Sequence, residues 1–181
     1  MSGVRKSLAK VEIALRWDPS PSGTPANDLD ILAAVYAGAD PYGEPVYLVH
    51  FGSRAPDGTI TLTRDSRTGQ GLGFDEVMVL ELDRLASELG RVVVGVVIQD
   101  GGPSAGHGAR TFAGVAGTGL RIREGYNELA TGNFAEVADS TAATVAEFVR
   151  DAEGVWSLDA RPHGFGVDAQ EYVRVMGAAR G

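Results

Sequence analysis

Short runs of apolar residues, separated by turn-forming residues, follow one another along almost the whole chain. Residues 11–17 alternate large apolar side chains with smaller or charged ones, at the period of two that is typical of a half-buried strand. Residues 29–36 are apolar at both odd and even positions, as in a central strand whose two faces are buried. Residues 91–98 form the most β-branched run and predict a buried strand.

The turns between these runs are as informative as the runs themselves. The chain has 25 glycines, which cluster between apolar segments and favour many tight turns, hence many strands. Further strands are predicted at residues 46–51, 59–63, 77–82 and 120–123. Since no regular helices separate them, the pattern predicts a mainly β chain: an antiparallel β-sandwich with short helices rather than a doubly wound sheet.

Several segments are ambiguous or helical. Residues 129–134 fit no single pattern, and the alanines of 141–150 favour a helix although the segment also fits a strand paired with 155–160 as a hairpin. One or two helical turns are expected at 83–89, with Asp83 as N-cap. Helical spacing after Asp168 predicts a short closing helix. We expect a single domain over residues 1–181, with a core at about 10–165 and a helical tail at about 167–178.

Charge and composition exclude some functions. The net charge of −8 and pI of about 4.8, with no offsetting run of lysine or arginine, disfavour nucleic-acid binding and favour a cation or a basic protein face as partner. The chain has no cysteine, which excludes disulfides, thiolate metal sites and a cysteine nucleophile. No signal peptide or membrane-spanning apolar run is visible, so a cytoplasmic location is expected.

One short motif suggests an enzyme. Residues 102–106 match the G-x-S-x-G pattern of a nucleophile elbow, with Ser104 as the nucleophile and His107 close by. The elbow needs a helix directly after the serine, and Gly106-His107-Gly108 is a poor helix start. A small serine hydrolase using Ser104 is therefore kept only as an alternative, and the bland interpretation is a surface loop.

Six carboxylates occur where predicted loops meet strands, and the loops at one end of a sandwich converge in space. They are Asp28, Asp30, Asp65, Asp75, Glu76 and Asp100. Ca²⁺ prefers about 6 to 8 oxygen ligands and accepts backbone carbonyls, which Gly69 and Gly71 would supply from a curled loop. Without an ion the clustered carboxylates would repel one another. The alternative is that these acids are ordinary N-caps, turn formers and solvated loop residues.

Three segments, residues 27–30, 65–77 and 97–100, resemble the signature segments of the TerD family, the tellurium-resistance and general stress proteins of bacteria. The order and spacing fit across roughly residues 10–165. The resemblance implies a β-sandwich similar to a C2 domain, with Ca²⁺ bound by loops at one end and no enzymatic activity. It also implies a role in tellurite resistance, in oxidative or phage stress, or in a membrane-associated stress complex with protein partners. No small-molecule substrate is implied.

The sequence also departs from the family pattern. Ser66 replaces the usual asparagine of the glycine-rich loop, Gln70 and Phe74 replace acids, and Gln99 replaces a histidine. The six carboxylates named above match. The resemblance therefore implies a module that binds one or two Ca²⁺ ions, and the departures leave open a degenerate scaffold or interaction subunit that no longer binds metal.

Overall fold

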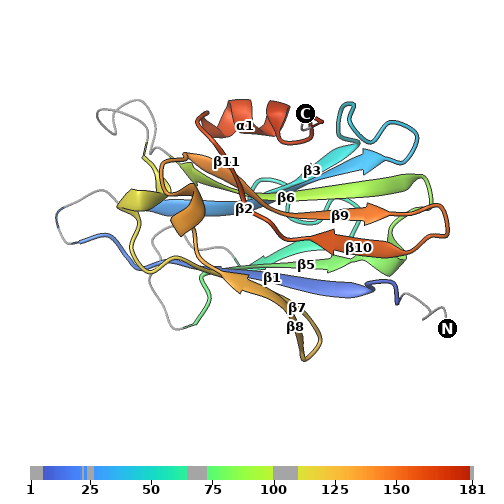
Figure 1. Ribbon diagram of the computed structural model, residues 1–181, viewed down its shortest axis with the longest axis horizontal. Coiled ribbons are helices and arrows are strands. Elements are labelled where there is room, and N and C mark those ends of the chain that lie inside the picture. Colours follow the sequence, from blue (N-terminus) through green and yellow to red (C-terminus); the bar gives the residue numbers. More distant parts are fainter. Residues whose placement is uncertain (1–5, 22, 24–26, 65–72, 100–109, 180–181) are drawn as a thin grey trace.

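Two antiparallel sheets packed face to face make up the described part of the chain, as the computed structural model in Figure 1 shows. The structure describes residues 6–21, 23, 27–64, 73–99 and 110–179. The five-stranded sheet has the order β4-β5-β1-β7-β8, and the six-stranded sheet has the order β10-β9-β6-β2-β3 with β11 beside β9. The predicted antiparallel β-sandwich is confirmed.

The strands and helices have the following bounds. The five-stranded sheet contains β1 (Lys10–Arg16), β4 (Ile60–Arg64), β5 (Glu76–Glu81), β7 (Gly119–Glu124) and β8 (Asn127–Gly132). The six-stranded sheet contains β2 (Asp28–Ala37), β3 (Tyr47–Val49), β6 (Leu89–Gln99), β9 (Ala142–Arg150), β10 (Trp156–Asp159) and β11 (His163–Phe165). The helices are η1 (Leu82–Arg84), η2 (Phe112–Gly114), η3 (Ala135–Val137) and α1 (Ala169–Val175).

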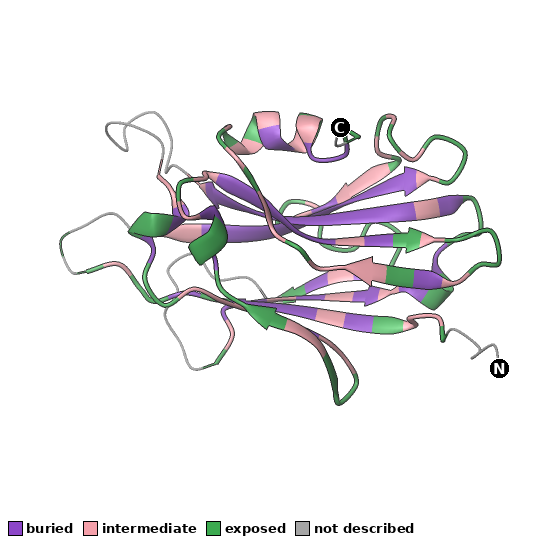
Figure 2. Ribbon diagram, viewed as in Figure 1, coloured by how far each residue is buried: buried purple, intermediate pink, exposed green. Residues whose placement is uncertain are grey.

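The six-stranded sheet is buried on both faces, whereas the five-stranded sheet is buried on one. On β2, Leu29 and Ile31 belong to the core between the sheets, while Leu32 and Tyr36 belong to a second cluster under α1. This explains why β2 is apolar at both odd and even positions. Figure 2 shows β2 and β6 buried along nearly their whole length, whereas β1 is exposed at both of its ends and partly exposed at Glu12.

The ambiguous segment 141–150 is a strand, β9, and not the helix that its alanines favoured. It pairs with β6 on one side and with β10 and β11 on the other. Its small side chains suit the close packing of a central strand: Ala143 and Ala146 lie in the core between the sheets, and Ala142 lies under α1. The β9–β10 hairpin is confirmed by the register of Arg150 with Trp156.

The helices are short. The expected turns at 83–89 reduce to the single 3₁₀ turn of η1, whose N-cap is Glu81, so the assignment of Asp83 as N-cap is wrong. The closing helix is present as α1, where the Asp168 side chain accepts a hydrogen bond from Glu171 N at 2.8 Å. In the part of the chain that the structure describes, no helix is long and apolar enough to span a membrane.

Candidate functional site

Four of the predicted site residues lie at one end of the sandwich, where β1 and β6 finish and β2 and β5 begin. Leu15 is paired with Glu76, and Asp28 with Gln99. This end is at the left of Figure 1. We call it the acidic end and define it by Asp28, Asp30, Asp75 and Glu76.

Glu76 connects the two sheets. Its side chain is fully buried, on the face of β5 that packs between the sheets together with Met78. Its Oε2 atom accepts a hydrogen bond from the backbone N–H of Ile31 on β2, at 2.6 Å. This N–H needs a partner because β3 pairs only with Ala33–Val35 and stops before it reaches Ile31. A carboxylate from one sheet thus caps the open edge of a strand in the other.

Asp75 and Trp17 hold the end of β1. Asp75 is 2% exposed, and its Oδ2 atom accepts a hydrogen bond from Trp17 N at 2.9 Å. Its own N–H donates to Leu15 O at 2.8 Å, which prolongs the β1–β5 ladder. The Trp17 indole N–H then donates to Asn27 O at 3.0 Å, directly before β2 begins. The start of β5, the end of β1 and the start of β2 are therefore tied together.

Asp30 is bonded within its own sheet. It is 4% exposed, and its Oδ2 atom accepts a hydrogen bond from Gln99 Nε2 at 2.7 Å. Side chains alternate along a strand, so Asp28 and Asp30 share the face of β2 that carries Leu32 and Tyr36, away from the opposing sheet. Glu76 lies on the opposite side of this sheet, between the layers.

The structure brings these carboxylates to one end but places them on two sides of the six-stranded sheet. Among the described residues no group of three or more His, Asp or Glu side chains is arranged to hold a metal ion. The other predicted ligands, Asp65, Gly69, Gly71 and Asp100, lie outside the described residues, as do Ser104 and His107 of the hydrolase alternative. The metal site therefore stays a prediction.

The donor chemistry of the acidic end nevertheless fits Ca²⁺. Ca²⁺ takes hard oxygen ligands, and a carboxylate has two oxygens with about four acceptor positions. Asp30, Asp75 and Glu76 each accept one N–H bond through one oxygen. Each of these bonds orients its carboxylate, as hydrogen bonds from neighbouring groups do for carboxylates that bind a metal ion.

Phe74 and Gln99, two of the departures from the family pattern, have clear structural partners. The Phe74 ring lies 4.4 Å from the guanidinium carbon of Arg121 on β7, a cation–π contact on the outer face of the five-stranded sheet. Gln99 donates to Asp30, as described above. Trp17 was not a candidate in the sequence. Its position at the junction of a strand and a polar loop is the only signal that could have identified it.

Two antiparallel sheets, one short closing helix and carboxylates collected at one end define an antiparallel β-sandwich module with an acidic end. The profile of the TerD domain matches residues 1–174, and the chain belongs to this family. The resemblance inferred from the three signature segments is thereby confirmed.

Two named relatives match most of the chain. The chain is 26% identical over 168 residues to tellurium resistance protein TerD of Serratia marcescens, covering 91% of this chain and 85% of that protein. It is 29% identical over 163 residues to the uncharacterized protein YceE of Bacillus subtilis, covering 87% of this chain and 82% of that protein.

Solved structures of similar chains have the same fold. One, a protein of unknown function, is 55% identical with a TM-score of 0.90, and the match covers 97% of this chain and 100% of that chain. Another, a homologue of telluride resistance protein (TerD) from Streptomyces coelicolor A3(2), is 48% identical with a TM-score of 0.89, covering 96% and 99%.

Proposed function

We propose that this chain is a non-enzymatic, calcium-binding TerD module of the bacterial stress response, acting in resistance to tellurite or to oxidative or phage stress. The family supports the physiological part, since relatives of this chain are named tellurium resistance proteins. The observation that carries the calcium part is the acidic end, where three carboxylates are anchored by N–H donors at the ends of strands.

In this proposal Ca²⁺ is held by Asp28, Asp30, Asp75 and Glu76 together with Asp65, Asp100 and the carbonyls of Gly69 and Gly71. The ion neutralises carboxylates that would otherwise repel one another, and so joins strand ends from both sheets. Strand ends that are fixed in this way would present one defined surface to a protein partner. Partners with a basic face suit the net charge of −8, whereas nucleic acid does not.

Thermal unfolding of chelator-treated protein tests the calcium part. A ligand that binds only the folded state stabilises it by RT ln(1 + [L]/Kd), about 2.7 kcal/mol at a hundredfold excess over Kd. We expect a rise in Tm with Ca²⁺ that Mg²⁺ does not reproduce. Asp75→Asn keeps an acceptor for Trp17 N but removes the charge, so it should reduce the Ca²⁺ response. Glu128→Gln, at an exposed position of β8, is the matched control.

A metal-free scaffold is the second candidate, favoured by Phe74 and Gln99. Both stand where the family pattern has other residues, and both are engaged in contacts within the protein. An unchanged Tm with Ca²⁺, in chelator-treated protein that is still folded, would establish this candidate over the first. Capture of the same cellular partners with and without chelator would then show that association needs no ion.

Two further parts of the proposal have direct tests. Cell fractionation tests the cytoplasmic location, and recovery of the chain with the membrane fraction would indicate a membrane-associated complex instead. A fluorophosphonate probe tests the non-enzymatic assignment. Labelling that disappears in Ser104→Ala would contradict the assignment and support the hydrolase.

A further inference from the structure

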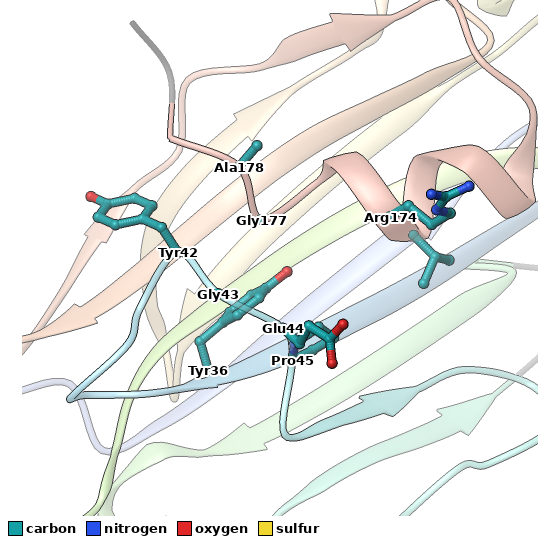
Figure 3. A pocket seen from close by; sticks show the side chains of 9 residues that line it. Tyr36, Tyr42, Gly43, Glu44, Pro45, Arg174, Gly177 and Ala178 are labelled. Carbon is teal, nitrogen blue, oxygen red and sulfur yellow. The ribbon is translucent and has the colours of Figure 1, made fainter.

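A pocket of about 500 Å³ lies between the C-terminal end of α1 and the loop that joins β2 to β3 (Figure 3). Tyr36 lies between its two walls, which are formed by loop residues 42–45 and by residues of the segment 173–178. This volume is in the range of small-molecule sites, roughly 300–1,000 Å³. The pocket is distinct from the acidic end, because eight residues of extended strand separate Tyr36 from Asp28, roughly 26 Å.

The Tyr36 side chain is almost fully buried, and its hydroxyl group faces this pocket. The residue is 1% exposed, yet its oxygen points into the space between Gly43 and Gly177 (Figure 3). No residue of the described ranges forms a hydrogen bond with this hydroxyl. Burial raises the pKa of Tyr36, partly offset by Arg91, so the group is a protonated O–H donor at neutral pH. An O–H donor that faces a pocket and has no protein partner among the described residues is available to a ligand or to ordered water.

Arg91 makes the pocket rigid by holding both of its walls. Its Nη1 atom donates to Pro41 O at 2.9 Å and to Gly177 O at 2.7 Å, and its Nε atom donates to Glu147 Oε1 at 2.8 Å. The guanidinium carbon lies 5.1 Å from the ring centroid of Tyr36 and 4.5 Å from that of Tyr42. The walls are therefore positioned before any ligand binds, which lowers the entropy cost of binding.

Two residues of opposite charge line the pocket. Glu44 lies on the loop wall, and no ion pair to it is found among the described residues. Arg174 lies on the helix wall, and its only ion pair in the described chain is a solvent-exposed one with Glu171 at 3.4 Å. Such an exposed pair contributes little and is readily exchanged. Apolar surface between these charges comes from Pro45 and Val173.

We propose that this pocket binds a small zwitterion, an α-amino acid with an apolar side chain. The ligand carboxylate pairs with Arg174 and accepts the hydrogen bond of the Tyr36 hydroxyl, while its ammonium group pairs with Glu44. Its side chain packs on the apolar wall. Because both charged partners are exposed, we expect a Kd on the order of 1 mM. The site is independent of Ca²⁺ and of the function proposed above.

The test is an NMR titration of ¹⁵N-labelled full-length protein with L-phenylalanine, run once with chelator and once with Ca²⁺. Two matched analogues each keep one charge: 3-phenylpropionate has only the carboxylate, and phenethylamine has only the ammonium group. We expect saturable shifts of the Gly43, Val173 and Gly177 amides with L-phenylalanine. Each analogue should bind at least about fivefold more weakly.

Three substitutions identify which pocket residue contacts which group of the ligand. Tyr36→Phe should weaken L-phenylalanine binding about tenfold, whereas Tyr126→Phe, at a fully exposed tyrosine of the β7–β8 turn, should leave it unchanged. Glu44→Gln should weaken phenethylamine but not 3-phenylpropionate, and Arg174→Gln should do the reverse. Both rim positions are exposed, so these two variants keep the fold and the test does not depend on Tyr36→Phe alone.

Three outcomes would overturn the proposal. One is the absence of shifts at pocket amides up to about 20 mM L-phenylalanine, roughly twentyfold above the expected Kd. Another is equal binding of L-phenylalanine and a single-charge analogue, which would show that the second charge of the ligand does not contribute to binding. The third is unchanged L-phenylalanine binding in both rim variants. The calcium response of the acidic end is measured separately, so its failure would not affect these results.

Discussion

At the scale of single residues, Glu76 shows how a buried carboxylate is accommodated in this fold. Burial of a charge is costly unless hydrogen bonds compensate for it. Glu76 accepts the Ile31 N–H that the short strand β3 leaves uncovered, so one contact satisfies a backbone donor and orients a carboxylate. Glu76 thus has a structural role that does not depend on any cation, in addition to its proposed role as a Ca²⁺ ligand.

Glu76→Ala should therefore destabilise the protein even without any cation. The substitution leaves the Ile31 N–H buried without its acceptor and opens a cavity between the sheets, which together should cost about 2–4 kcal/mol. Urea unfolding in the presence of chelator measures this loss. Glu128→Ala on β8 is exposed and should change stability by less than about 0.5 kcal/mol. Equal effects of the two substitutions would contradict the structural role of Glu76.

The hydrogen bonds of Asp57 should cause part of the pH dependence of the free energy of unfolding. Burial tends to raise its pKa, but hydrogen bonds from the Thr59 hydroxyl and N–H and from the Tyr47 hydroxyl outweigh this and lower the pKa below its ordinary value of 3.8. The unfolded chain therefore takes up a proton here before the folded chain does. The stabilisation is complete above about pH 4 and is lost as the pH falls through the folded-state pKa.

On acidification, the Tm of the Asp57→Asn variant should accordingly fall less than the Tm of the unchanged protein. Thermal unfolding at about pH 5 and about pH 3 measures this difference in the window where the aspartate titrates. Asp83→Asn, at an exposed position of η1, is the matched control. The same acid-induced fall in Tm for Asp57→Asn and for the unchanged protein would disprove the contribution of Asp57.

The sequence predicted that Asp28, Asp30, Asp75 and Glu76 lie at one end of the sandwich, but it did not predict which groups they contact. Antiparallel strands of known length place Asp28 and Glu76 at strand starts, which is why the convergence could be predicted. Which side each carboxylate faces depends on the opposing sheet, and the partner of Glu76 depends on where β3 stops. No local pattern records either fact. The Tyr36 pocket is harder still, since Glu44 and Arg174 come from distant segments.

At the scale of elements, β9 is a strand although the helix propensity of its residues favours a helix. Its alanines favour a helix locally, but pairing with β6 on one side and with β10 and β11 on the other supplies backbone hydrogen bonds that override that preference. The strand β11 was not predicted at all, because His163–Phe165 is too short to show a period. The long apolar strands β2 and β6 were predicted well, since burial on both faces leaves an unmistakable run.

The packing of α1 on β6 depends on one glycine. A Cβ atom at Gly95 would clash with the Tyr172 hydroxyl, which itself hydrogen-bonds to the Thr144 hydroxyl at 2.7 Å. Gly95→Ala should displace α1 and destabilise the protein by about 1–3 kcal/mol in urea unfolding. Gly132→Ala on β8 meets no atom within 4 Å and should be nearly neutral. A neutral Gly95→Ala would show that α1 is not held as described.

At the scale of the whole molecule, the two sheets differ in how they meet solvent. The six-stranded sheet lies between the five-stranded sheet and α1, whereas the outer face of the five-stranded sheet carries no helix among the described residues. That outer face is polar and partly charged, with Glu12 paired to Arg121 and Arg123. Among the described residues, the six-stranded sheet is therefore covered on both faces, whereas the five-stranded sheet has one face exposed to solvent.

The order of strands predicts slow folding. Five of the nine pairings between the described strands join strands that are not neighbours in sequence: β1, for example, pairs with β5 and β7, and Ile13 lies opposite Ile122. Such pairings must close long loops before they gain any contact, so refolding should take about milliseconds to seconds. Stopped-flow dilution from urea, followed by tryptophan fluorescence, measures this rate. Complete recovery within the dead time of mixing would contradict the prediction.

The contacts of Arg91 have a consequence for how the molecule opens. One guanidinium holds a carbonyl of the β2–β3 loop and a carbonyl just beyond α1, so neither segment can leave its place without breaking bonds to the same group. Segments that share their stabilising contacts open as one cooperative unit in native-state hydrogen exchange. The amides of α1 and of the non-proline residues in 40–45 should therefore exchange with a common opening free energy, below that of β2 and β6.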